Sequence, residues 1–148
     1  MRIPLLMPHK SLSLLAVFTL LGVCGCGDPA RPHLERLVYD WGVVIATGYT
    51  HSDDYTRDEQ RVHMFHEQSV AMTHMLSAFL ADDPPVSDEL KQLLRKWKKV
   101  NDENAAIHAK MISENRFIYT VEEQSRVDTL VRADFACGGD LMSHLEGY

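Results

Sequence analysis

Three histidines and a glutamate have a spacing that could bring their side chains to one metal ion. His63, His66 and His74 fall within an arc of about 80° when they are placed on a helix, with Glu67 beside them. Imidazole and carboxylate groups bind divalent metals, so these four residues are candidate ligands. The same arc points roughly 140° away from the apolar side of that helix. We therefore expect a solvent-exposed face, with metal binding as the alternative.

A second polar group falls on the apolar side of a later segment. Asn101, Asn104 and His108 recur at helical spacing among hydrophobic residues, which predicts that they are largely buried. Buried polar side chains need hydrogen-bond partners, so we expect these three to form a network that aligns neighbouring helices. Ligation is the alternative, because a histidine and a methionine from different helices can hold haem iron, and His108 could pair with Met72 or Met75.

Composition and motifs give no support for catalysis. The 148 residues carry a formal net charge of −6, which argues against a nucleic-acid partner because phosphate binding needs a basic patch. The sequence contains no Gly-x-Ser-x-Gly elbow, no glycine-rich phosphate loop and no His-Glu-x-x-His zinc motif. Cys137 is the one cysteine that follows Cys26, and we expect it to be buried at the end of a helix. We assign no catalytic residue and expect no cofactor.

Long helices must position these side chains. Between residues 49 and 137 the sequence has no glycine, and its only prolines are the adjacent Pro84-Pro85. This scarcity of helix breakers favours extended helical segments. Apolar residues at steps of three and four predict one helix over residues 56–81, opened by a capping box at Thr56. Ser87 is the expected N-cap of a second long helix.

A later helix is expected to start at a second capping box. Thr120 and Glu123 have the spacing of that motif and open a helix that we extend to about residue 136. The pair Gly138-Gly139 is then expected to break the helix before a short turn over residues 141–145.

An earlier helix over residues 33–50 completes the set of helices. No convincing strand pattern of period two occurs, and the predicted connections are short. The sequence therefore predicts an all-α fold, an antiparallel helical bundle of about four helices over residues 33–148.

The first 25 residues have the layout of a secretory signal peptide. Arg2 and Lys10 precede an uncharged apolar run over residues 11–23. Such a run is too short to cross the hydrocarbon core, which requires about 20 residues, so we expect cleavage rather than a permanent span. Residues 26–32 would then form a short tether between the cleavage site and the bundle.

The end of this segment carries a more specific pattern. Val23-Cys24-Gly25-Cys26 resembles the lipobox of bacterial lipoprotein precursors. The resemblance implies that Cys26 becomes the first residue of the mature chain and carries a covalent lipid such as palmitate, with Cys24 as the competing register. Two or three acyl chains anchor a protein stably to a membrane. Gly27 lacks the aspartate that commonly marks inner-membrane retention in enteric bacteria, so the resemblance favours the outer membrane over the inner membrane.

Two classes of function remain open at this point. The first is a lipid-anchored helical binding module that faces the periplasm or the cell surface and contacts another envelope protein, as an assembly factor, a secretion pilot or an exclusion or immunity factor. Amphipathic helices without catalytic motifs favour it. The alternative is a metal- or haem-binding sensor or carrier that uses histidine and methionine ligands.

Overall fold

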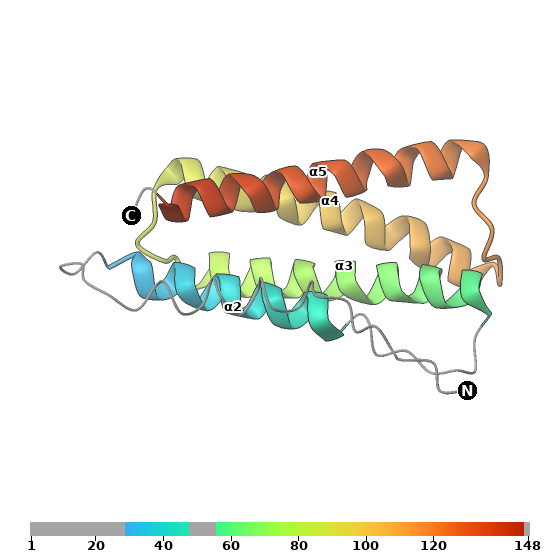
Figure 1. Ribbon diagram of the computed structural model, residues 1–148, viewed down its shortest axis with the longest axis horizontal. Helices are drawn as coiled ribbons and strands as arrows, with labels where there is room; N and C mark the ends of the chain where they lie inside the picture. The colour runs from blue at the N-terminus through green and yellow to red at the C-terminus, as the bar shows by residue number, and fades with distance from the viewer. Residues whose placement is uncertain (1–28, 48–55, 147–148) are drawn as a thin grey trace, which may run out of the picture.

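Four helices make up the described part of the chain. The computed structural model describes residues 29–47 and 56–146, and no strand occurs within these ranges. The helices are α2 (Arg31–Thr47), α3 (Arg57–Ala81), α4 (Asp88–Ser113) and α5 (Val121–Glu146). Consecutive helices run in opposite directions, as Figure 1 shows. The predicted all-α antiparallel bundle of four helices is confirmed.

The helix starts follow the local signals of the sequence. Thr56 caps α3: its hydroxyl accepts from the Glu59 N–H, and the Glu59 carboxylate accepts from the Thr56 N–H at 2.7 Å. The hydroxyl of Ser87 accepts from the N–H of Leu90 at the start of α4. These caps satisfy N–H groups that have no partner within a helix, and they fix where each helix begins. Both predicted starts are confirmed.

The core lies along α4, which packs against both α3 and α5, whereas α2 packs mainly against α3. Trp97 lies at its centre, fully buried, with its ring edge-on to Trp41 at 5.3 Å between ring centroids. The buried apolar residues around it include Leu34, Leu37, Met72, Leu76, Leu90, Leu94, Cys137 and Leu141.

The predicted break at Gly138-Gly139 is wrong, because α5 continues through both glycines to Glu146. The reason is a contact between distant parts of the chain. Gly138 is buried, and a Cβ atom at this position would lie 2.9 Å from the Trp41 ring. The missing side chain therefore lets α2 approach α5 closely, and this packing outweighs the low helix propensity of glycine. The expectation that Cys137 ends a helix is wrong for the same reason, although the residue is buried as expected.

Helix α2 begins earlier than predicted. It starts at Arg31, and Ala30 before it is only 2% exposed, so the end of the predicted tether belongs to the bundle. The signal peptide, Cys24 and Cys26 lie outside the described residues, as do residues 48–50 of the predicted first helix. Within residues 29–47 and 56–146, no helix is long and apolar enough to span a bilayer.

Candidate functional site

The histidines predicted to share one face of α3 meet different surroundings. Nδ1 of His66 lies 3.2 Å from the carbonyl oxygen of Ala105, so α4 covers this half-buried side chain. The predicted solvent-exposed face is therefore wrong at His66. The ring of His63 packs against Phe117, with 5.9 Å between ring centroids, whereas His74 is exposed.

The fourth candidate ligand, Glu67, is also exposed. Across the described parts of the chain, no group of three or more histidine, cysteine, aspartate or glutamate side chains is arranged to hold a metal ion. The spacing that placed His63, His66, Glu67 and His74 on one arc does not bring them to a common point in the fold.

Asn101, Asn104 and His108 all lie in the core, where each is less than a tenth exposed. The side-chain amides of Asn101 and Asn104 bond to other helices and not to one another, and Asn101 also donates to the Trp97 carbonyl of its own helix. Asn104 donates to Oγ of Ser69 on α3 at 2.8 Å, and Asn101 donates to Oδ1 of Asp134 on α5 at 2.8 Å. The predicted role in helix alignment fits this pattern, because each amide ties α4 to a different neighbour.

Both ring nitrogens of His108 have oxygen partners. Nδ1 lies 2.7 Å from the carbonyl oxygen of Asn104, and Nε2 lies 2.7 Å from the Tyr119 hydroxyl. Met72, the methionine considered with it for haem, is packed in the apolar core. Burial lowers the pKa of His108 and raises the pKa of Tyr119, so both side chains are neutral near pH 7.

Tyr119 belongs to the turn that joins α4 to α5, and this turn is closely held. Asn115 adopts a left-handed conformation, with φ of 50°, just after α4 ends. The next N–H, that of Arg116, donates back to the carbonyl of Met111 at 2.9 Å. This is the geometry of a Schellman-type helix end, which reverses the chain sharply.

Arg116 then ties the turn to the first residues of α5. Its guanidinium donates to both oxygens of Glu123, at 2.7 Å each, and to the carbonyl of Ile118 at 2.9 Å. Glu123 also accepts from the N–H of Thr120, and the Thr120 hydroxyl accepts from the Glu123 N–H. The predicted capping box is therefore confirmed. The guanidinium and these hydrogen bonds lower the pKa of Glu123 to about 2.

The same turn leaves large apolar side chains in solvent. Ile118 is 72% exposed and Val121 is 90% exposed, beside the half-buried Phe117. We call Phe117, Ile118 and Val121 the apolar turn. It lies at the opposite end of the bundle from the start of α2 (Figure 1). Ile118 and Val121 are therefore candidates for contact with another molecule.

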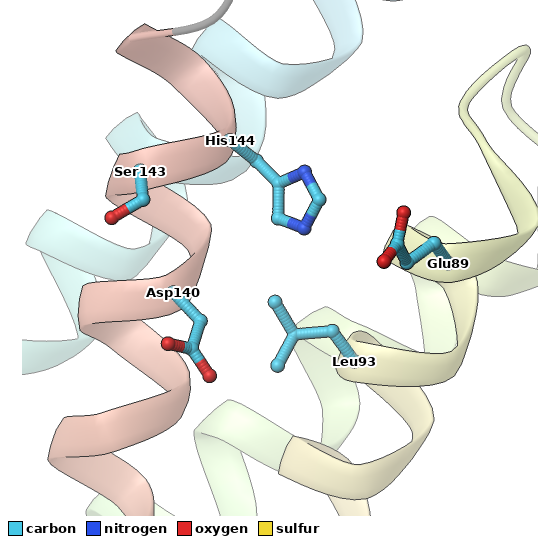
Figure 2. A pocket seen from close by; sticks show the side chains of 5 residues that line it. All are labelled: Glu89, Leu93, Asp140, Ser143 and His144. Carbon is cyan, nitrogen blue, oxygen red and sulfur yellow. The ribbon is translucent and has the colours of Figure 1, made fainter.

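A shallow pocket of about 390 Å³ lies at the other end of the bundle, between α4 and α5. Figure 2 shows Glu89 and His144 pointing toward each other across it, with Leu93 and Asp140 below. No hydrogen bond or ion pair joins these polar side chains to one another within the described residues. Among the described residues, the pocket contains no arranged ligand set, and the hydroxyl of Ser143 in its lining donates to the carbonyl of Gly139.

Two features that the fold creates were not predicted from the sequence. The exposure of Ile118 and Val121 depends on how the turn folds back. No pattern of neighbouring residues in the sequence indicates this exposure. The second feature is the half-buried Asp134, which accepts from Nε1 of Trp97 at 2.5 Å. A signal for it was present, because a buried tryptophan N–H usually requires an acceptor.

Comparisons with protein families, with curated proteins and with solved structures find no significant match for this chain.

Proposed function

We propose that this chain is a lipid-anchored helical binding module of the cell envelope, which contacts another envelope protein through the apolar turn. The observation that carries the proposal is the exposure of Ile118 and Val121 on a turn held by Arg116 and Glu123. The lipobox-like segment that ends at Cys26 supplies the anchor, with the outer membrane favoured over the inner membrane.

The position of the turn suits a membrane-anchored protein. Only three residues separate Cys26 from Ala30, which is already packed in the core. Lipid on Cys26 would therefore hold the start of α2 near the bilayer. The apolar turn lies at the far end of α5, whose 26 residues span roughly 39 Å at 1.5 Å per residue. A partner in the periplasm or at the surface would meet this end first.

The rigidity of the turn favours binding. Association costs free energy when flexible groups must be ordered, and a loop that is already fixed avoids much of that cost. The hydrogen bonds of Arg116 and Tyr119 fix the backbone on both sides of Ile118 before any partner arrives. Burying Ile118 would then contribute its apolar surface without a large ordering penalty.

Site-specific photocrosslinking in intact cells tests the binding surface. A photoreactive amino acid at Ile118 is expected to give a discrete adduct, whereas one at the exposed Thr129, in the middle of α5, gives none. Val121→Asp is expected to weaken the Ile118 adduct without changing folding, because Val121 is almost fully exposed. Equal adducts at both positions, or none at Ile118, would contradict the proposal.

Fatty-acid labelling tests the anchor separately. Cys26→Ser is expected to abolish incorporation of labelled palmitate, and Cys24→Ser is expected to retain it. Labelling that persists in Cys26→Ser and disappears in Cys24→Ser would move the anchor to the competing register, while labelling of both variants would contradict a single lipidation site.

A further inference from the structure

An apolar cavity opens where α2 stops. Helix α2 has 17 residues against 25 or 26 in the other three helices, so it covers only part of the bundle (Figure 1). Its last turns lie beside the middle of α3, where Gln68 donates to the carbonyl of Ile45. A cavity of about 360 Å³ lies here, with residues of all four helices in its lining. This volume is within the range of small-molecule sites in proteins.

The donor groups at the polar side of this cavity already have acceptors. Nε1 of Trp97 and the amide of Asn101 both donate to Oδ1 of Asp134, at 2.5 and 2.8 Å. The amide nitrogen of Asn104 donates to Ser69 at 2.8 Å. Each of these hydrogen bonds uses an N–H of the protein, and the side-chain oxygens of Asp134, Asn104 and Ser69 are the acceptors beside them.

Two of those acceptors have no matching donor. Oδ1 of Asn104 is buried without a hydrogen-bond partner, although the residue is only 7% exposed. Oδ2 of Asp134 receives no hydrogen bond and pairs with no lysine, arginine or histidine within the described residues, and it is open to solvent. The unmatched acceptor costs free energy only at the buried Asn104, whereas the open Oδ2 can reach a ligand in the cavity.

The rest of the cavity is apolar and rich in aromatic rings. Trp41, Phe65 and Phe135 line it together with Met64 and Leu130. Phe135 is 73% exposed, so it stands at the open side. Aromatic faces attract cations, and the attraction grows when the cation is removed from water.

We propose that this cavity binds a small organic ammonium compound, with the N–H groups of the cation directed to Oδ2 of Asp134 and its apolar substituent among the aromatic rings. The ammonium group supplies a positive charge, which no described lysine, arginine or histidine places beside this carboxylate. An anionic ligand is disfavoured by the Asp134 carboxylate, and a purely apolar ligand leaves that carboxylate without a counter-ion.

Three probes of similar size distinguish these cases. The full chain in non-ionic detergent is titrated with phenylethylamine, phenylethanol and phenylacetate, and binding is followed by calorimetry and by fluorescence of Trp41, which lines the cavity. We expect saturable binding of the amine only. Asp134→Asn is expected to weaken amine binding by roughly tenfold or more, since bonds to charged groups are the stronger ones. Asp128→Asn removes the same charge from an exposed position on α5 and is expected to leave binding unchanged.

A second variant keeps the test valid if Asp134→Asn fails to fold. Phe135→Ala removes a ring that is mostly in solvent, so the fold should persist while amine affinity falls. The proposal is overturned if the amine shows no saturable binding, if phenylacetate binds as tightly, or if amine affinity is unaffected by both Asp134→Asn and Phe135→Ala. None of these outcomes bears on the crosslinking at the apolar turn.

Discussion

Gly138 and Gly139 are neighbours in α5, and we expect their replacement by alanine to have different effects on stability. A Cβ atom at Gly138 would lie 2.9 Å from both Cη2 and Cζ2 of the Trp41 indole. Real Cβ atoms almost never come so close to another heavy atom, so the indole has to move. It is packed against Trp97 and cannot move without disturbing that contact. A Cβ atom at Gly139 would have nothing within 4 Å, so a methyl group fits there.

The magnitudes follow from two opposing contributions. Alanine in place of glycine inside a helix stabilises by about 1 kcal/mol, and both variants gain this. Overpacking a filled site costs roughly 1–3 kcal/mol, and only Gly138→Ala incurs this cost. We therefore expect Gly139→Ala to stabilise by about 1 kcal/mol, and Gly138→Ala to be less stable than Gly139→Ala by about 1–3 kcal/mol.

Urea denaturation of the two single variants and the parent measures the difference, with helical circular dichroism as the signal. A double variant provides the control. In a Trp41→Leu background the indole is gone, so Gly138→Ala should recover most of the stability that it lost. Equal stabilisation by both alanines, or a penalty at Gly138 that persists without the indole, would refute the proposed contact between α2 and α5.

Three further predictions concern other parts of the bundle. Trp97→Ala is expected to lower the free energy of unfolding by about 3–5 kcal/mol in urea denaturation, because the side chain is fully buried; a loss below about 1 kcal/mol would place the ring outside the core. The lowered pKa of Glu123 means that its stabilising effect is present above its ordinary pKa of 4.5 and is lost as the pH falls toward about 2, so Glu123→Gln should flatten acid unfolding in that window. An unchanged acid profile would argue against the ion pair. Copper, zinc or nickel should shift the melting temperature of the parent no more than that of a variant with His63, His66 and His74 all replaced by glutamine; a metal site at 100 times its dissociation constant would instead stabilise only the parent, by about 2.7 kcal/mol.

The sequence predicted the helix starts because their signals are local. Thr56, Ser87 and Thr120 each act on N–H groups two or three residues further along the chain, within reach of a single side chain. The long stretch without glycine predicted that α3 and α4 are long helices, for a similar reason. The burial of Asn104 and His108 followed from helical spacing, which needs only the identity of neighbouring residues.

The errors and omissions came from contacts between distant segments. Gly138 is predicted to break the helix when only its neighbours in the sequence are considered. The contact that favours glycine at this position comes from Trp41, almost a hundred positions earlier in the chain. His66 is expected in solvent until α4 is placed over it. The two candidate binding surfaces also depend on how distant segments come together. The exposure of Ile118 depends on the turn between α4 and α5, and the cavity depends on where α2 ends.

The buried polar residues of α4 determine how the helices of the bundle are aligned. An apolar stripe alone would let helices slide past one another at little cost, whereas each buried hydrogen bond lost in a slipped arrangement costs about 1–3 kcal/mol. Asn104 to α3, Asn101 to α5 and His108 to the turn at Tyr119 therefore specify one alignment of the bundle. Within the described residues, the buried side-chain atom that this arrangement leaves unsatisfied is Oδ1 of Asn104. Asn104 borders the cavity at the end of α2, but Oδ1 itself is closed to solvent, so its missing hydrogen bond is a free-energy cost of this alignment.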